Sequence, residues 1–174
     1  MSTLDSVTLP VPTQGVYRID PERSVVRVST RAMFGLLPVR GTVRVGGGVL
    51  RVVTPTENSS VEAVIRADTF DTANQERDEH VRSADFLNTT AYPEFVFTGD
   101  RWSIARGRPV LHGQLTVRGI TGPVDVTLKS LSQRGGELTA QATARVDRYA
   151  FGITRSRGLA GRHLRIDIEV VAAT

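Results

Sequence analysis

The residues of this sequence best suited to acid–base or metal chemistry are three histidines, and their spacing favours neither chemistry. His80, His112 and His163 lie far apart, and the chain has no HxH or HExxH step that would place two imidazoles on one metal ion. His80 closes the run Arg77-Asp78-Glu79-His80. On a regular helix Asp78 is too near in sequence to face His80 and orient it as a general base. We therefore expect Arg77 and Asp78 to anchor a helix to neighbouring backbone, and we expect no metal site.

Motifs for nucleophilic catalysis and phosphate binding are also missing from the sequence. There is no cysteine and no GxSxG step, so the chain offers neither a thiolate nucleophile nor the serine elbow of a hydrolase. No GxGxxG step opens a helix, and Gly46-Gly47-Gly48 is not followed by the lysine of a phosphate-binding loop. These patterns predict no catalytic residue and no cofactor, and they favour binding over catalysis.

Composition indicates one globular domain with a basic surface. The chain has 174 residues, a net charge of +4 and a pI near 10.3, which raises nucleic acid as a partner. All basic residues except Lys129 are arginines. Many stand between two apolar neighbours, which indicates the solvent face of a sheet: Arg27, Arg44, Arg66, Arg118, Arg145 and Arg165. Aromatic residues make only 6% of the chain, few for a single-strand platform. A basic nucleic-acid module stays an alternative, but we expect no nucleic-acid partner.

The first fourteen residues carry Pro10 and Pro12 but no Lys, no Arg and no apolar stretch, so they are not a secretory signal. The longest apolar runs, such as Val170-Val171-Ala172-Ala173, are too short for a membrane helix. The lack of cysteine agrees with a reducing compartment. We expect a cytoplasmic protein with no integral membrane segment, a disordered arm over residues 1–14 and one domain over residues 15–174.

Apolar side chains recur at every second position through the rest of the chain. Leu164, Ile166, Ile168 and Val170 alternate with charged residues, and residues 61–67, 124–128 and 138–146 alternate in the same way; this places one apolar face on each strand. Turn signals lie between these stretches: Gly46-Gly47-Gly48, residues 54–60, Gly99-Asp100, Gly107, Gly122-Pro123 and Gly135-Gly136. Eight or nine short strands joined by tight turns predict an all-β antiparallel barrel or sandwich.

One segment breaks the alternation. Thr72-Ala73-Asn74-Gln75 has the spacing of a capping box, and residues 73–84 are rich in Glu, Arg and Ala. We expect a short helix there, with Thr72 as its N-cap, inserted between two strands and covering a barrel mouth or a sheet edge.

Several predicted inward positions hold small side chains: Ala63, Ala67, Ala140, Ala142 and Ala144. A closed eight-stranded barrel is either filled by side chains or holds one small ligand, and small lining residues leave apolar space for a ligand. A flattened sandwich, filled by opposing large residues, agrees equally well with the composition.

Five stretches occur in an order typical of one known family. They are Tyr17-Arg18-Ile19-Asp20, the run from Thr72 to Leu87 with its Arg77-Asp78-Glu79-His80 step and Asp85-Phe86 pair, Tyr92-Pro93 followed by Phe97, residues 113–121, and residues 148–153. Together they cover almost the whole chain and resemble the YceI-like family, also called the polyisoprenoid-binding or lipid-binding, lipocalin-like family. The resemblance implies an extended lipocalin-like antiparallel β-barrel of eight to nine strands with one short helix. It also implies a long apolar cavity for an isoprenoid chain, and a homodimer.

We therefore expect the chain to bind a long-chain isoprenoid or other lipid, of the polyprenyl or isoprenoid-quinone type, for carriage, storage or sequestration. Large apolar residues near strand ends or the helix are the expected lining: Phe34, Phe70, Phe86, Phe95, Phe97, Trp102 and Phe151. Polar residues are expected near the ligand head: Arg77, His80, Tyr92 and Arg148. The alternative is an enzyme acting on an isoprenoid quinone or related lipid, with His80 as its acid or base.

Overall fold

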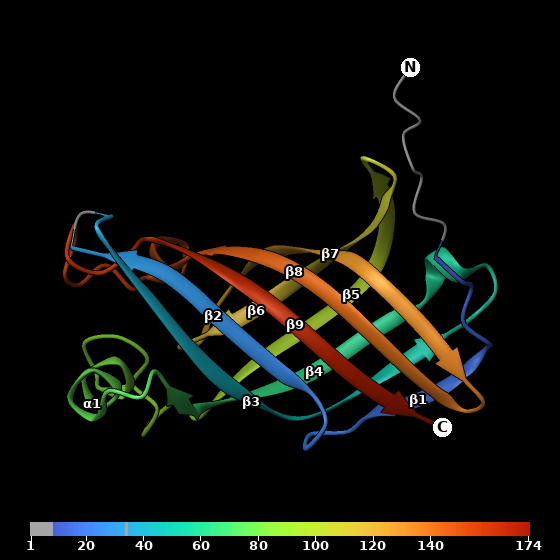
Figure 1. Cartoon of the computed structure of the whole chain (residues 1–174), viewed down its shortest axis with the longest axis horizontal. Helices are drawn as coiled ribbons and strands as arrows, with labels where there is room; N and C mark the ends of the chain where they lie inside the picture. The colour runs from blue at the N-terminus through green and yellow to red at the C-terminus, as the bar shows by residue number, and fades with distance from the viewer. Residues whose placement is uncertain (1–8, 34) are drawn as a thin grey trace.

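Eight antiparallel strands close into a barrel in the computed structural model, which describes residues 9–33 and 35–174 (Figure 1). Around the ring the order is β3-β2-β9-β8-β7-β6-β5-β4, and the pairing of β4 with β3 closes it. A ninth strand, β1, lies outside this ring and pairs with β3 and β9. Closure leaves the ring without a free sheet edge. The predicted antiparallel barrel of eight to nine strands is confirmed.

The strands are β1 (Gly15–Ile19), β2 (Val25–Ala32), β3 (Leu37–Val52), β4 (Ser60–Asp71), β5 (Glu94–Ala105), β6 (Arg108–Val117), β7 (Ile120–Arg134), β8 (Glu137–Asp147) and β9 (His163–Ala173). The described residues also contain one α-helix, α1 (Gln75–Arg82), and two 3-10 turns, η1 (Thr56–Asn58) and η2 (Arg148–Phe151). None of these helices has the length and apolar character needed to cross a bilayer.

The two-residue period predicted from the sequence sets the two faces of the barrel wall. Five of the six arginines singled out for their alternation are exposed on strands: Arg27, Arg44, Arg66, Arg145 and Arg165. Arg118 differs, because it lies in the turn between β6 and β7 and donates from Nη1 to the carbonyl oxygen of Phe86 at 2.7 Å. The wall is therefore polar outside and apolar inside.

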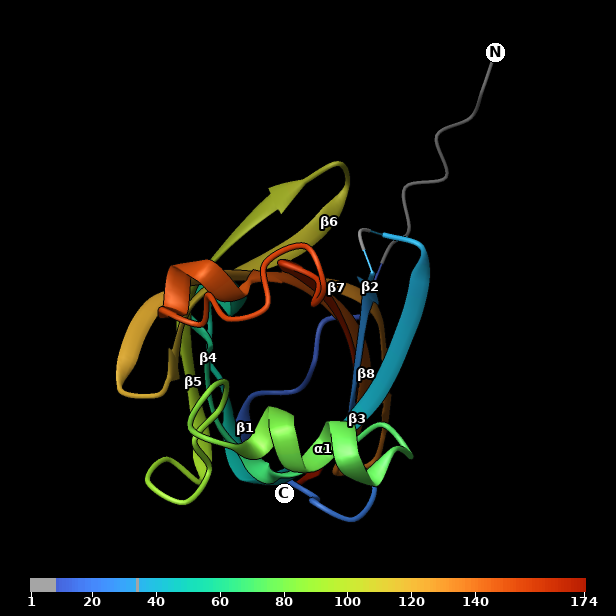
Figure 2. The same cartoon turned by 90° about the vertical axis from the view of Figure 1, so that its left-hand side faces the viewer.

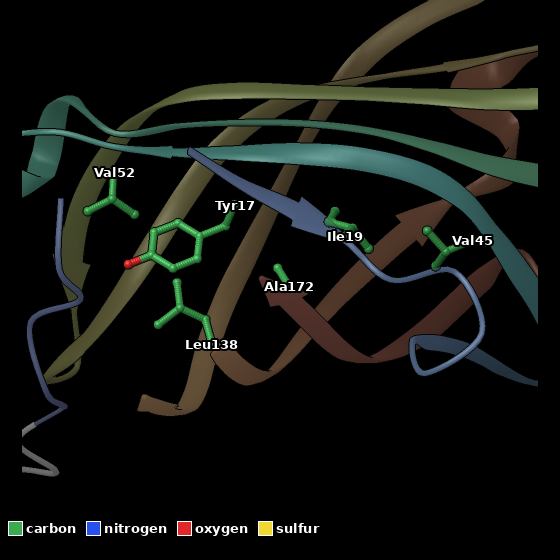
Figure 3. Close-up of a cluster of buried hydrophobic side chains, with 6 residues drawn as sticks. All are labelled: Tyr17, Ile19, Val45, Val52, Leu138 and Ala172. Atoms are coloured by element: carbon green, nitrogen blue, oxygen red, sulfur yellow. The ribbon is translucent and has the colours of Figure 1, made fainter. Parts of the chain in front are cut away.

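β1 fills the wedge between β3 and β9 that β2 does not reach. β2 begins opposite Arg44 of β3 and Glu169 of β9, whereas β1 pairs with residues 49–52 of β3 and 172–173 of β9. This brings the almost fully buried Tyr17 between Val52 and Leu138 in a packed cluster (Figure 3). Its hydroxyl donates to the carbonyl oxygen of Thr13 and accepts from Gln133.

The connections define two ends of the barrel. At the end here called the α1 end lie the β2–β3 hairpin, α1 with the loop that follows it, the β6–β7 turn and the β8–β9 loop over residues 148–162. At the opposite end, the β1 end, lie the β3–β4, β5–β6 and β7–β8 connections and residues 9–14. Figure 2 faces the α1 end: α1 crosses the lower part of the opening and the β8–β9 loop crosses the upper part. The helix therefore covers a barrel mouth rather than a sheet edge.

Three of the predicted turns lie inside strands, so those predictions were wrong. Gly46-Gly47-Gly48 belongs to β3, Gly99-Asp100 to β5 and Gly122-Pro123 to β7. Beside Gly47 the register of β3 against β4 shifts, and a Cβ on Gly48 would overlap the Glu62 carbonyl oxygen. Glycine there permits a bulge and close backbone approach rather than a turn. The connections predicted at residues 54–60, Gly107 and Gly135-Gly136 are confirmed.

The helix predicted over residues 73–84 is present but begins two residues later, at Gln75. The prediction that Thr72 is its N-cap was wrong. Asn74 is the N-cap, and its side-chain oxygen accepts the backbone N–H of Arg77 at 3.0 Å. Asparagine and threonine are both favourable N-caps, and the Thr72 hydroxyl is engaged elsewhere, as a donor to Asp78.

Candidate functional site

A cavity of about 1100 Å³ occupies the barrel interior, at the upper end of the size range of small-molecule sites. Most of its wall is apolar, and β9 contributes Leu164, Ile166, Ile168 and Val170. These inward side chains are only partly buried, which a filled core would not show. Their apolar surface is accessible from within the barrel.

Small side chains keep this interior open. Ala63 of β4 and Ala140, Ala142 and Ala144 of β8 line the cavity. Ala142 pairs with Leu128 of β7 and Ile168 of β9, which also line it. Of the two alternatives that the sequence left open, the structure has the hollow barrel and not the filled sandwich. Ala67 differs from the other predicted positions, because it is fully buried away from the cavity wall.

Two packed clusters border the hollow. One surrounds Tyr17 at the β1 end (Figure 3). The other joins the loop after α1 to the β8–β9 loop and consists of Phe86, Val117, Val124, Val146, Phe151 and Ile153. The barrel is thus held by side-chain packing at its ends, while its middle stays open to a ligand.

Asp78 fixes α1 to the end of β4, the anchoring role that the sequence indicated. Its buried carboxylate accepts the Thr72 hydroxyl at 2.6 Å and the Thr72 backbone N–H at 3.0 Å. Burial acts to raise the pKa of Asp78, but the hydrogen bonds from Thr72 and the charge of Arg82 outweigh it and lower the pKa below its ordinary value. The charged carboxylate therefore stabilises the helix across the cavity mouth.

Arg77 and His80 line the cavity at the α1 end. Arg77 donates from Nε to the Thr72 hydroxyl at 2.9 Å, and its two terminal nitrogens have no hydrogen-bond acceptor within the described chain. His80 Nε2 lies 3.2 Å from Asp85 Oδ2, and its ring meets Phe86 edge-on at 5.0 Å between centroids. Helical spacing pointed only to Asp78 as a partner for His80. The loop after α1 supplies Asp85 instead.

Arg148 organises the β8–β9 loop. Its Nε, Nη1 and Nη2 donate to the carbonyl oxygens of Gly161, Ile153 and Ala160 at 2.8, 2.8 and 3.0 Å. The residue is only 5% exposed, and burial lowers the pKa of its guanidinium from the ordinary value. Because every guanidinium nitrogen already meets a carbonyl, Arg148 positions the loop at the mouth, although its side chain also reaches the cavity wall.

The predicted aromatic residues are divided between the cavity and its surroundings. Those that line the cavity are Phe70, Phe86, Phe95, Phe97 and Trp102. Trp102 lies towards the β1 end, where its Nε1 donates to the Ser59 carbonyl oxygen at 3.0 Å. Phe151 packs in the core cluster beside the cavity, and Tyr92 is exposed beside Gly119 rather than on the cavity wall. Phe34 lies outside the described residues.

A lining segment that the sequence analysis did not identify comes from the supposed arm. Leu9, Pro10, Val11 and Pro12 contribute to the cavity wall at the β1 end. Thr13 follows them, and its N–H donates to Gln133 Oε1 at 2.8 Å. Residues 9–13 thus contact the barrel at the β1 end, and the rest of the predicted arm, residues 1–8, lies outside the described residues. Prolines with no strand alternation gave no signal for this contact.

A series of hydrogen bonds between side chains on the outer face was also not predicted from the sequence. His112 Nε2 meets the Ser103 hydroxyl and its Nδ1 meets Asp125 Oδ1, each at 2.7 Å. The order of groups is that of a nucleophile, a base and an orienting acid. The backbone of β5 pairs with β6 around Ser103, and β6 pairs with β7 where His112 lies opposite Asp125. This series of hydrogen bonds therefore links β5, β6 and β7 on the barrel wall. Within the described part of the protein, no three His, Cys, Asp or Glu residues gather as a metal site.

Comparison with known proteins agrees with this architecture. The YceI-like domain matches residues 17–172. Proteins named Protein YceI from Shigella flexneri and Escherichia coli O157:H7 are 34% and 33% identical over an alignment of 115 residues that covers 63% of this chain. The match spans 60% of the length of each relative.

Two solved structures share the fold. Burkholderia cenocepacia BcnA matches with a TM-score of 0.76 and 20% identity, over 89% of this chain and 99% of that one. A polyisoprenoid binding domain from Saccharophagus degradans, implicated in plant cell wall breakdown, matches with a TM-score of 0.65 and 12% identity, over 91% and 98%. Because the domain match runs from β1 to β9 and so includes every strand of the closed barrel, this chain belongs to the YceI-like family.

Proposed function

We propose that this protein binds one long-chain isoprenoid, of the polyprenyl or isoprenoid-quinone type, inside the barrel for carriage, storage or sequestration. The observation that carries the proposal is the apolar cavity of about 1100 Å³ between two packed ends. The fold shared with a polyisoprenoid binding domain supports it. An isoprenoid chain is long, flexible and apolar, so it matches the apolar interior of the barrel.

The binding free energy comes from removing apolar surface from water, at about 25 cal/mol per Å². A wall of mostly apolar side chains makes few directional contacts, so the length of the ligand chain rather than its exact chemistry decides affinity in the barrel interior. Selectivity for the polar head then depends on the ends of the cavity.

The head of the ligand is placed by this proposal at the α1 end, beside Arg77 and His80. Arg77 has terminal nitrogens free of acceptors in the described chain, and His80 is oriented by Asp85. Both residues line the cavity next to α1. Phosphate, hydroxyl or quinone oxygens can all accept hydrogen bonds from such donors.

The direct test is gentle organic extraction of the purified protein followed by mass spectrometry of the extract. The proposal predicts an isoprenoid in roughly stoichiometric amount, and less of it from Ala142→Phe, whose added ring occupies the cavity. An extract with no isoprenoid, from protein that also fails to take one up when it is added, contradicts the proposal.

A second candidate function is an enzyme acting on the same class of lipid. The observation that favours it is the contact between His80 and Asp85, because a carboxylate can orient a histidine as acid or base. Turnover of an isoprenoid quinone that stops in a folded His80→Ala variant would support this alternative. Unchanged lipid after long incubation with the wild type would exclude it.

The homodimer that the family resemblance implies is also a proposal. Measurement of the molar mass in solution by light scattering tests it, since the monomer is 18.9 kDa.

A further inference from the structure

Four apolar side chains are exposed together at the α1 end. Leu36 is 83% exposed, and Met33, Leu37 and Leu159 are each about half exposed. The first three belong to the β2–β3 hairpin, and Leu159 belongs to the β8–β9 loop. We call these four residues the apolar rim. Apolar side chains that are exposed next to one another often mark an interaction surface.

The two segments of the apolar rim are held side by side. The backbone N–H of Met33 donates to the Leu159 carbonyl oxygen at 2.8 Å. Gly161 packs so closely on Thr30 and Arg31 that a Cβ would overlap both. Arg148 fixes the same loop from inside through the carbonyl oxygens of Ala160 and Gly161. The fold therefore presents the rim as one surface, fixed at its base.

The charge around the apolar rim has one sign. Residues 31–40 and 148–163 contain six arginines and neither Asp nor Glu. Arg155 and Arg162 pair with Asp85 and Asp147, and Arg148 is buried. The other three make no ion pair within the described chain: Arg31, Arg40 and Arg157. Four carboxylates at this end of the barrel are exposed, and none belongs to the rim segments: Asp71 at the end of β4, Glu76 and Glu79 on α1, and Glu94 at the start of β5. α1 crosses the opening on the side away from the rim (Figure 2).

The apolar rim is continuous with the cavity. Ala32, Ser156, Leu159 and Ala160 belong to the rim segments and also line the cavity wall. A lipid chain leaving a bilayer at this point would pass from one apolar surface to the next without crossing water. Exposed leucines flanked by unpaired arginines match a surface of hydrocarbon beneath anionic head groups.

We propose that the apolar rim docks the α1 end onto an anionic lipid bilayer, with the four rim side chains inserted and α1 turned away. The proposal rests on the proposed function for the identity of the cargo, but the docking can be measured without it. A bilayer is favoured over a protein partner because arginines without an acidic partner flank the apolar side chains and the rim segments also line the cavity.

The experiment is co-sedimentation of the purified protein with vesicles of phosphatidylcholine, with and without phosphatidylglycerol. We expect binding to the anionic vesicles that weakens as salt is added. Leu36→Asp and Leu37→Asp should each weaken it about tenfold, because a charge replaces an inserted side chain. The matched control is Val16→Asp, another half-exposed aliphatic residue of a strand but at the β1 end, and it should bind as the wild type does.

Equal loss in Val16→Asp, no loss in Leu36→Asp, or equal binding to neutral vesicles overturns the docking proposal. A changed molar mass of Leu36→Asp in solution, with vesicle binding unaltered, would assign the rim to contact between copies of the chain and also overturns it. Failure of the proposed function is distinguishable, because in that case the wild type still sediments with anionic vesicles but takes no isoprenoid from them.

Discussion

Thr72 donates both its hydroxyl and its backbone N–H to the carboxylate of Asp78, six residues later in the chain. This pair joins the last residues of β4 to the middle of α1. It also holds Arg77, which donates to the same hydroxyl. One buried carboxylate thus sets the position of the helix and of a polar residue at the cavity mouth.

Asp78→Asn should therefore lower the free energy of unfolding by about 1–3 kcal/mol, because a buried charge-assisted acceptor is replaced by a neutral amide. Glu79→Gln is the matched control on the same helix, since Glu79 is exposed, and it should change stability by less than about 0.5 kcal/mol. Chemical denaturation at neutral pH measures both. Equal effects would contradict the anchoring role.

The lowered pKa of Asp78 also predicts how the free energy of unfolding depends on pH. The folded pKa of Asp78 lies below its ordinary value, so in acid the unfolded chain takes up the proton first and folding stability is lost as pH falls. The stabilisation by the charged Asp78 is complete above its pKa in the unfolded chain, about 4, and disappears as pH falls through its pKa in the folded protein. The difference in stability between wild type and Asp78→Asn should narrow over that range. A difference that stays constant down to acid pH would count against this assignment.

Arg148→Lys should loosen the β8–β9 loop, because one ammonium cannot reach the three carbonyl oxygens that the guanidinium meets. We expect a loss of about 2–3 kcal/mol in stability and faster proteolysis between Gly152 and Arg162. Arg157→Lys is the control, since Arg157 is exposed and lies over the Tyr149 ring. If the loop is cut at wild-type rate in Arg148→Lys, the positioning role is wrong.

Ala142→Phe tests whether the cavity is empty space available to a ligand. In a filled core the larger ring would cost about 1–3 kcal/mol, but here it enters the cavity, so ligand-free protein should keep or gain stability. Binding of a long-chain isoprenoid should weaken, because ring and chain compete for one volume. Thr139→Phe, exposed on the outer face of β8, should leave binding unchanged. A destabilised Ala142→Phe variant that binds normally would show that no ligand occupies this part of the barrel.

The sequence predicted most of the barrel and little of its polar detail. Alternation at Leu164, Ile166, Ile168 and Val170 is a local signal, and the strand and its inward face followed from it. The glycines of β3 match the pattern of a turn, because a bulge depends on the neighbouring strand, which local sequence does not reveal. Thr72 has the spacing of an N-cap, and local sequence does not reveal its hydrogen bond to Asp78, which forms only once the helix has folded back on β4.

The residues of the candidate site were also predictable only in part. Large apolar type led to Phe70 and Phe95 on the wall but also to Phe151, which packs beside it, and polar type led to Tyr92, which lies outside it. Leu9 to Pro12 line the cavity through tertiary contact alone, and no periodicity indicates it. Whether the barrel is hollow or filled depends on the summed volume of the side chains that face its interior. The alanines of β8 alone left that question open, because their partners on β7 and β9 were not known from the sequence.

The central claim is that the cavity holds an isoprenoid chain, and the most direct measurement is the affinity of delipidated protein for isoprenoids of increasing length. Each added unit of five carbons should strengthen binding by about 1.5 kcal/mol, or about tenfold in Kd, at the usual efficiency per atom. The gain should stop once the chain fills the cavity, and it should stop at a shorter chain in Ala142→Phe. Affinity that does not depend on chain length, or that stops at the same length in both proteins, would contradict an isoprenoid chain in the barrel.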